Sequence, residues 1–171
     1  KIGQLGTLEE VLALCGVDRR ITPCIDFGHL NARTLGGIRS KADYAAILDR
    51  IGEALGDARA RQFHVHFSRI EYSKGGEKRH WTFAETQFGP EPQPLMELLA
   101  ERGLAPVIIC ESAGTQAEDA KTMKRFFEAC LCTTSQSSLR SPAPLVGEPL
   151  AKPETLRGLP RPPLVRGGGI A

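Results

Sequence analysis

The sequence is short of long apolar runs, of aromatic side chains and of net charge. No apolar run approaches the roughly 18 to 20 residues that a membrane-spanning helix needs, and the first residues lack the apolar stretch of a signal peptide. Aromatic residues make up 6% of the 171 residues, and 22 Lys and Arg against 20 Asp and Glu leave a net charge of +2. With 25% charged and 41% hydrophobic residues, the composition excludes collagenous, coiled-coil and fully disordered classes. It predicts a soluble globular protein with room for one ordinary domain.

Cysteines are few, and their spacing does not form a disulfide framework. The five are Cys15, Cys24, Cys110, Cys130 and Cys132. Only the last two stand close together, and C-x-C by itself is a weak metal signal. We therefore expect a cytoplasmic protein, in a reducing compartment, whose thiols serve mostly as small buried hydrophobic side chains.

The end of the chain differs in composition from the rest. Residues 131–171 hold 7 of the 12 prolines, 5 Lys or Arg against 2 acids, and no aromatic residue or histidine. Residues 1–130 hold 17 Lys or Arg against 18 acids, so the mild positive charge is no argument for nucleic-acid binding by this part. A segment so poor in large apolar side chains cannot offset its ordering entropy. We predict a folded region over 1–130 and a disordered Pro/Arg-rich tail over 131–171, whose composition also suits an out-of-frame end.

Capping and periodicity signals predict helices that alternate with strands. Thr7 and Glu10 form a capping box ahead of one helix, and Thr115 and Glu118 form another. Stripes of apolar residues and short alternating runs supply the remaining signals. Together they predict helices at 8–16, 41–56, 94–102 and 116–130, strands at 21–27, 61–68 and 106–111, a turn at 28–29 and a polar loop at 69–90. Strands that alternate with helices indicate a parallel sheet in an α/β fold.

Four polar residues are expected at or near the carboxyl ends of these strands: Asp26, His64, His66 and Glu111. In α/β folds this edge of the sheet is where sites are built. His64 and His66 share one face of an alternating strand, and two buried imidazoles are costly unless both are bonded or bind a ligand. Two alternatives remain open, because Asp26 before Gly28 is also ordinary turn chemistry and Glu111 alone would serve as a partner for a helix or loop.

The predicted loop adds three cations, a histidine and the single tryptophan. A structureless loop of this length in a compact domain is usually functional. The functional interpretation is binding of phosphate by Lys74, Lys78 and Arg79, with His80 as a metal ligand. The alternative is a solvated surface loop, and Trp81 fits either stacking on a ligand or packing.

Asp, Glu and His side chains together suit Zn²⁺, Mn²⁺ or Fe²⁺. None of the cysteines clusters with these candidate ligands, which disfavours a thiolate site. A divalent ion would act as a Lewis acid on a phosphoryl or carbonyl oxygen, or lower the pKa of a bound water. We therefore expect a divalent-metal site in which Asp26 or Glu111 could bridge two ions.

Four segments resemble, in order, the endonuclease IV family of xylose-isomerase-like TIM barrels. The run Cys-Ile-Asp-Phe-Gly-His-Leu-Asn-Ala carries the family's Asp-x-x-His signature at Asp26 and His29, and His64 falls where the family has a metal-binding histidine. Gly-Gly-Glu-Lys-Arg-His at 75–80 is similar to the segment in which Asp-Arg-His supplies two more ligands. Glu111 is similar to the glutamate on the family's last strand.

The resemblance implies both a fold and an activity. The fold is the C-terminal half of a TIM barrel, with about three parallel strands and four helices. The activity is DNA repair by a trinuclear, usually zinc, endonuclease that hydrolyses the phosphodiester 5′ to an abasic site. By this similarity Asp26, His64 and Glu111 share one catalytic metal site, in which Glu111 and Asp26 help to place the attacking hydroxide. His29 and His80 hold another ion.

The chain departs from the family's pattern at two points. Lys78 stands where the family has aspartate, so Glu77 beside it and His66 are the candidates for additional ligands. Half a barrel also lacks the strands that carry the family's other ligands. Its exposed apolar edges predict self-association.

Two other functions remain open. A sugar isomerase or epimerase on the same type of barrel would use one divalent ion and a small-molecule site, since fold alone does not determine function. An inactive fragment would keep only residual affinity for metal. Binding that depends on salt favours DNA, because cations on the protein then replace the counterions of phosphates.

Overall fold

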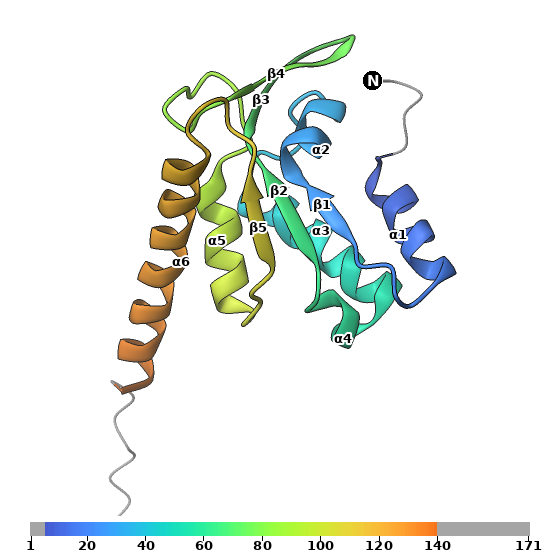
Figure 1. Cartoon of the computed structure of the whole chain (residues 1–171). Coiled ribbons are helices and arrows are strands. Elements are labelled where there is room, and N and C mark those ends of the chain that lie inside the picture. Colours follow the sequence, from blue (N-terminus) through green and yellow to red (C-terminus); the bar gives the residue numbers. More distant parts are fainter. Residues whose placement is uncertain (1–5, 140–171) are drawn as a thin grey trace, which may run out of the picture. The chain divides into compact units, whose positions relative to one another are not determined.

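A computed structural model describes residues 6–139 of the chain, with the side chains of residues 6–132, and contains a three-stranded parallel sheet (Figure 1). The helices are α1 (Leu8–Val17), α2 (Phe27–Arg33), α3 (Lys41–Leu55), α4 (Asp57–Ala60), α5 (Pro92–Glu101) and α6 (Gln116–Leu139). The strands are β1 (Cys24–Asp26), β2 (His64–Phe67), β3 (Arg69–Ser73), β4 (Gly76–Trp81) and β5 (Val107–Cys110). The predicted α/β class with a parallel sheet is therefore confirmed.

The parallel sheet has the strand order β1-β2-β5, which is also the order along the chain. Two rows of paired residues cross it on one face. The row nearer the amino ends is Cys24, His64 and Val107, and the row nearer the carboxyl ends is Asp26, His66 and Ile109. The pairing continues past β5, because the backbone N–H of Glu111 donates to the carbonyl of Phe67 at 2.9 Å. Glu111 is thereby held at the carboxyl edge of the sheet.

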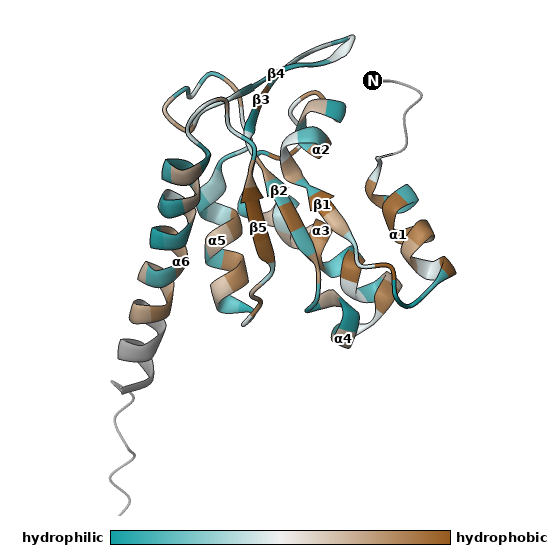
Figure 2. Cartoon of the chain, viewed as in Figure 1, coloured by the Kyte–Doolittle hydropathy of each residue, from teal (hydrophilic) through white to brown (hydrophobic). Residues whose placement is uncertain are grey.

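One face of this sheet is packed and the other is open. Strand residues that alternate with the two rows, such as Ile25, Val65 and Phe67, are buried in the main core. Figure 1 shows α3 and α5 behind the sheet, α6 beside β5 and α1 beside β1. On the opposite face Val107 and Ile109 remain 57% and 49% exposed, although β5 is hydrophobic along its length (Figure 2). Parallel sheets are normally covered on both faces, so this open face is unusual.

Several predicted elements are confirmed close to their expected bounds. α1 begins with the predicted capping box, in which the Thr7 hydroxyl accepts the backbone N–H of Glu10 at 3.2 Å and the Glu10 carboxylate accepts that of Thr7 at 2.9 Å. α3 ends at Gly56, whose positive φ of 78° is a conformation that glycine adopts without strain. The third predicted helix and the three predicted strands are present as α5, β1, β2 and β5.

Two helices were not predicted. α2 occupies the segment expected to be a turn, because Asp26 acts as its N-cap and accepts the backbone N–H of His29. The four-residue α4 follows Gly56 directly. Both helices are too short to show an apolar stripe, which is the signal that revealed the longer ones.

The prediction of a structureless polar loop at 69–90 is wrong over its first half. β3 and β4 form an antiparallel hairpin there, with Ile70 opposite His80. Gly75 lies in the turn of the hairpin and Gly76 begins β4, where it pairs with Ser73. The hairpin is anchored by aromatic contacts, because Trp81 and Tyr72 each lie with their ring centroids 5.2 Å from that of Phe88. Trp81 is 7% exposed, so of the two predicted roles the structure favours packing.

α6 continues to Leu139, beyond the predicted end of the folded region at residue 130. The first proline after this helix is Pro142, so no strong helix breaker stands in the added turns. The predicted disordered tail lies outside the described residues from residue 140 onward. Among the described residues, no helix is both long enough and apolar enough to cross a membrane. The expected burial of thiols holds for Cys15 and Cys110 but not for Cys24 and Cys132, which are exposed, and Cys130 is partly buried.

Candidate functional site

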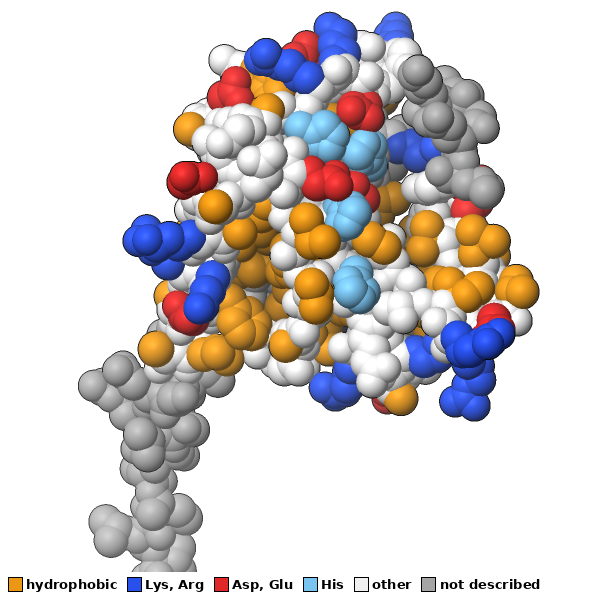
Figure 3. Space-filling model, viewed as in Figure 1, with side chains coloured by type: hydrophobic (Ala, Val, Ile, Leu, Met, Phe, Trp, Pro, Cys, Tyr) orange, Lys and Arg blue, Asp and Glu red, His pale blue; other side chains and the backbone are white. Residues whose placement is uncertain are grey.

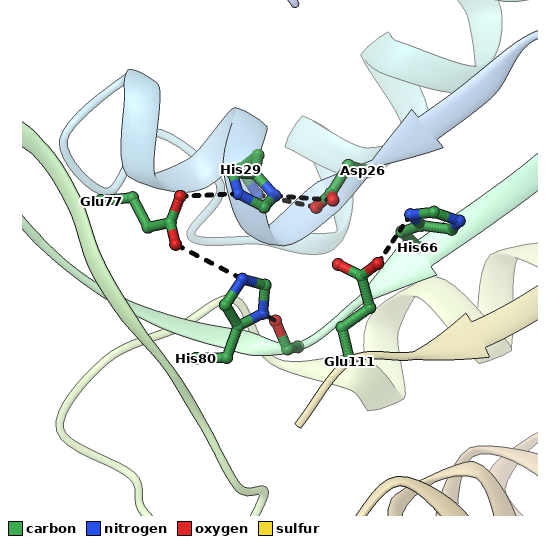
Figure 4. A network of polar contacts seen from close by, with 7 residues as sticks. Asp26, His29, His66, Glu77, His80 and Glu111 are labelled. Carbon is green, nitrogen blue, oxygen red and sulfur yellow. Dashed lines mark hydrogen bonds and ion pairs between the residues drawn. The ribbon is translucent and has the colours of Figure 1, made fainter. Parts of the chain in front are cut away.

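Six ionisable side chains gather at the carboxyl edge of the parallel sheet (Figure 4). We call them the rim cluster: Asp26, His29, His66, Glu77, His80 and Glu111. They come from the ends of β1, β2 and β5, from the first turn of α2, and from β4. Figure 3 shows histidine side chains in a column on this face, with acidic side chains between the upper ones. The cluster thus unites residues of three parallel strands with residues of the hairpin.

Asp26 ends β1 and binds His29 twice. Its Oδ1 accepts the backbone N–H of His29 at 2.8 Å, and its Oδ2 lies 2.6 Å from the ring Nδ1. Burial raises the pKa of the Asp26 carboxyl, but the two hydrogen bonds from His29 outweigh burial and leave this pKa below its ordinary value. The hydrogen bond to Asp26 raises the pKa of His29 to about 9 against the effect of burial, and Glu77 adds to the increase. At neutral pH His29 is therefore an imidazolium between two carboxylates.

Glu77 connects the imidazoles of His29 and His80. Its Oε2 lies 2.9 Å from Nε2 of His29, and its Oε1 lies 3.4 Å from Nε2 of His80. The ring centroids of the two histidines are 5.2 Å apart. The other ring nitrogen of His80, Nδ1, lies 2.8 Å from the hydroxyl of Ser68. Both rings therefore direct Nε2 toward the same carboxylate.

His66 and Glu111 form the third contact of the cluster. Nδ1 of His66 lies 3.0 Å from Oε1 of Glu111, and both side chains are about one third exposed. His66 is in register with Asp26 on the neighbouring strand. Two carboxylates and an imidazole therefore face one another across the ends of three strands.

Two sets of three ligand atoms lie within 4.8 Å of one another among the described residues. One set is His29, Glu77 and His80, and the other is Asp26, His29 and Glu111. Two imidazoles and a glutamate form a ligand set used by catalytic zinc, which leaves a coordination position open. Metal-bound histidines usually donate their second ring N–H to an oxygen atom. His29 and His80 have such oxygens at Nδ1, so the donor set fits zinc.

His64 lies outside the rim cluster. The prediction that His64 and His66 share one face of the strand is confirmed, but His64 begins β2 and pairs in register with Cys24. His64 stands two positions before His66, which corresponds to about 7 Å between the two residues along the strand axis. The alternating pattern shows that both histidines lie on the same face of the strand, but it does not show which one lies at the carboxyl end. The structure places His66, not His64, at the position expected for the metal ligand.

The hairpin cations are mostly paired with acids of the hairpin. Lys78 Nζ lies 3.2 Å from Oε1 of Glu71, and Arg79 Nε lies 3.3 Å from its Oε2. Arg79 also lies 3.5 Å from Glu85 and 4.8 Å above the ring of Trp81. These contacts hold Lys78 and Arg79 on the surface of the hairpin and reduce the positive charge that they present to a ligand.

A cavity of about 480 Å³ opens beside the rim cluster between α1, β1, α2 and the turn of the hairpin. Asp26, His29 and Glu77 line it on the side of the cluster, and Lys74 and Arg33 line it as well. Of the three predicted phosphate-binding cations, Lys74 is thus the one that lines this cavity.

The chain is 34% identical to the uncharacterized protein MJ0133 of Methanocaldococcus jannaschii over 128 residues, which is 75% of this chain and 46% of that protein. The chain therefore spans about half the length of the curated relative that it matches. No family model matches the sequence, and no solved structure matches it. The comparisons identify an archaeal relative and assign no reaction to either protein.

The sequence interpretation missed Ser68 as a part of the site. The alternation that relates His64 to His66 continues two residues further to Ser68, so the signal was present. A serine carries no metal-ligand signature of its own, and only the hairpin brings His80 to it.

Proposed function

We propose that the protein is a divalent-metal phosphodiesterase of DNA repair that cleaves on the 5′ side of abasic sites, with zinc as the metal and the reducing cytoplasm as its compartment. The observation that carries the proposal is the approach of His29, Glu77 and His80 to one point beside Asp26 and Glu111. This arrangement follows the ligand order implied by the resemblance to endonuclease IV, with Glu77 in place of aspartate and His66 in place of His64.

The rim cluster divides into two halves with different roles. His29, Glu77 and His80 would hold the cation, and Asp26, His66 and Glu111 would position and activate the attacking water beside it. A bound cation supplies Lewis acidity toward a phosphoryl oxygen and lowers the pKa of a coordinated water.

Glu111 and His66 are the acid–base pair of the proposed reaction. The Glu111 carboxylate lies on the open face and would accept the proton of the attacking water as the bond between phosphorus and the 3′ oxygen breaks. That oxygen would leave as a 3′-hydroxyl after taking up a proton, while His66, 3.0 Å from Glu111, would hold the carboxylate in place. Asp26 orients His29 through its two hydrogen bonds and so positions the half of the cluster that contains Glu77 and His80. A cleaved phosphate then faces Lys74 at the turn of the hairpin, while Lys78 and Arg79 contact more distant phosphates of the DNA.

The parallel sheet is proposed to be part of a larger barrel of the TIM type. The three strands run parallel in chain order, their open face exposes Val107 and Ile109, and the matched relative is about twice as long as the region of similarity. Further strand and helix units would cover the open face and bring additional ligands to the rim cluster. This is the arrangement that parallel sheets require, with helices outside and side chains packed inside.

A divalent-metal sugar isomerase or epimerase is the second candidate. The cavity beside Asp26, His29 and Glu77 favours it, because about 480 Å³ lies within the usual range for small-molecule sites. A neutral sugar would bind with little dependence on salt. Binding of DNA by Lys74, Lys78 and Arg79 would weaken steeply as salt increases.

The deciding experiment incubates the purified chain, with zinc, and a 5′-labelled duplex that contains one abasic site. We expect a single cut on the 5′ side of the lesion, which prolonged chelation abolishes and added zinc restores. His66→Ala is expected to reduce the cleavage rate by about 100-fold or more, because it removes a partner of Glu111.

His64→Ala is the matched control, since it removes the same ring from the same face of β2 but outside the cluster. It should leave the rate within about twofold of the unaltered protein. Intact DNA together with turnover of a ketose or aldose would reject the proposed phosphodiesterase and support the isomerase. Bound zinc well below one ion per chain would indicate a fragment without catalytic activity.

A further inference from the structure

Ser68 is a buried polar residue in contact with the rim cluster. It is 1% exposed, and its hydroxyl lies 2.8 Å from Nδ1 of His80. Ser68 directly follows β2. Its carbonyl oxygen lies so close to Gly28 of α2 that a Cβ added at Gly28 would stand 2.7 Å from this oxygen. The backbone of Ser68 is therefore fixed between β2 and α2. Its hydroxyl hydrogen can rotate about the Cβ–Oγ bond while the Oγ atom stays in place.

A neutral imidazole has one N–H, so one nitrogen donates and the other accepts. When Nε2 of His80 carries the proton, it faces the Glu77 carboxylate and the Ser68 hydroxyl donates to Nδ1. A cation needs the lone pair of Nε2, and the proton must then be on Nδ1. The Ser68 hydroxyl accepts that Nδ1–H by rotation alone, so it bonds the ring in both tautomers.

We infer that Ser68 is a positioning residue that orients His80 and accepts its Nδ1–H when a divalent cation binds at Nε2. The inference rests on the proposed metal site but not on the choice of substrate. It gives His80 the kind of support that Asp26 gives His29, with a neutral oxygen in place of a carboxylate. The two supports differ in charge, so the site gains a second oriented imidazole without a further anion beside Glu77.

The test measures zinc binding by calorimetry with a competing chelator, and follows the ring nitrogens of His80 by NMR. In the zinc-loaded protein we expect a protonated Nδ1 and a metal-bound Nε2. Ser68→Ala should weaken zinc binding by about 10- to 100-fold, as is usual when an oxygen that supports a metal-bound histidine is lost. Ser68→Thr keeps the hydroxyl and should recover part of the affinity.

Ser112→Ala is the matched control, because Ser112 is also fully buried and its hydroxyl has no hydrogen-bond partner among the described residues. It should bind zinc within about twofold of the unaltered protein. Unchanged affinity in Ser68→Ala, or zinc at Nδ1 of His80 in the unaltered protein, would overturn the inference. Tight zinc binding that weakens in Ser68→Ala, without cleavage of abasic DNA, would support the inference and reject the proposed phosphodiesterase. No zinc binding by the unaltered protein would reject both.

Discussion

The chemistry of the rim cluster depends on which atom each side chain presents. Asp26 divides its two oxygens between the backbone and the ring of His29, so the ring is fixed with Nε2 toward Glu77. His80 has the same orientation through Ser68. In the proposed metal site the two imidazoles form a ligand pair because their Nδ1 atoms are already bonded and their Nε2 atoms are left to face the cation.

The charge of His29 gives the stability of the metal-free protein a defined pH dependence. Its pKa of about 9 in the folded protein exceeds the ordinary 6.5, so protonation favours the folded state. This contribution is complete below about pH 6.5 and is lost as the pH rises through about 9. We expect the unfolding free energy of the unaltered protein to exceed that of His29→Gln at pH 6, and the difference to shrink by pH 10.

Urea unfolding of both proteins in the presence of a chelator measures this difference. Comparison at each pH removes the contribution of other groups that titrate in the same range. A difference that is constant or that grows with pH would show that His29 is not held as an imidazolium.

At the scale of elements, the site depends on how closely α2 approaches the strands that follow it in the chain. Gly28, in the first turn of α2, would place a Cβ 2.7 Å from the carbonyl oxygen of Ser68 and 3.0 Å from Ile70. Real Cβ atoms essentially never lie so close to another heavy atom. The missing side chain thus allows His29, the next residue, to reach the hairpin that carries Glu77 and His80.

Gly28→Ala is expected to destabilise the protein by about 1 to 3 kcal/mol, the usual cost of overpacking, and to weaken zinc binding. Urea unfolding and zinc calorimetry measure the two effects. Gly52→Ala is the control, because Gly52 lies inside α3 with nothing within 4 Å of the added Cβ. It should raise the unfolding free energy by up to about 1 kcal/mol through helix propensity. Equal behaviour of the two variants would contradict a close contact at Gly28.

At the scale of the whole molecule, the open face of the sheet is the dominant feature of the described residues. Two apolar side chains of β5 are about half exposed there, on a strand with no partner on its outer edge. An unpaired apolar strand edge is a template for association with another chain. If further strands do not cover this face, a second copy of the chain is the available partner.

We therefore expect the 171-residue chain to self-associate with increasing concentration, as sedimentation velocity would measure. Val107→Glu should shift the equilibrium toward monomer, because it places a charge on the open face. Val17→Glu is the control, since Val17 is 80% exposed but lies at the end of α1. A chain that is monomeric at all concentrations, or equal effects of the two substitutions, would reject the open face as the contact.

The class of fold and most of the long elements could be predicted from the sequence. Apolar stripes and the capping box at Thr7 are local signals, because the residues that form them lie within one segment of the chain. They do not depend on contacts with other segments. The hairpin could not be predicted in this way, because β3 and β4 carry charged residues and their pairing is a contact between segments. α2 was missed for a related reason, since its N-cap, Asp26, is also the last residue of a strand.

The sequence by itself determined which kinds of side chain are available for a metal and which strand face carries the histidines. It could not determine the end of the sheet at which each residue lies, because register is a relation between strands. The tertiary structure decided that His66, not His64, meets Asp26 and Glu111, and that Glu77 stands between His29 and His80. It also placed the Ser68 hydroxyl against the ring of His80, because this contact forms only when the hairpin packs beside the end of β2.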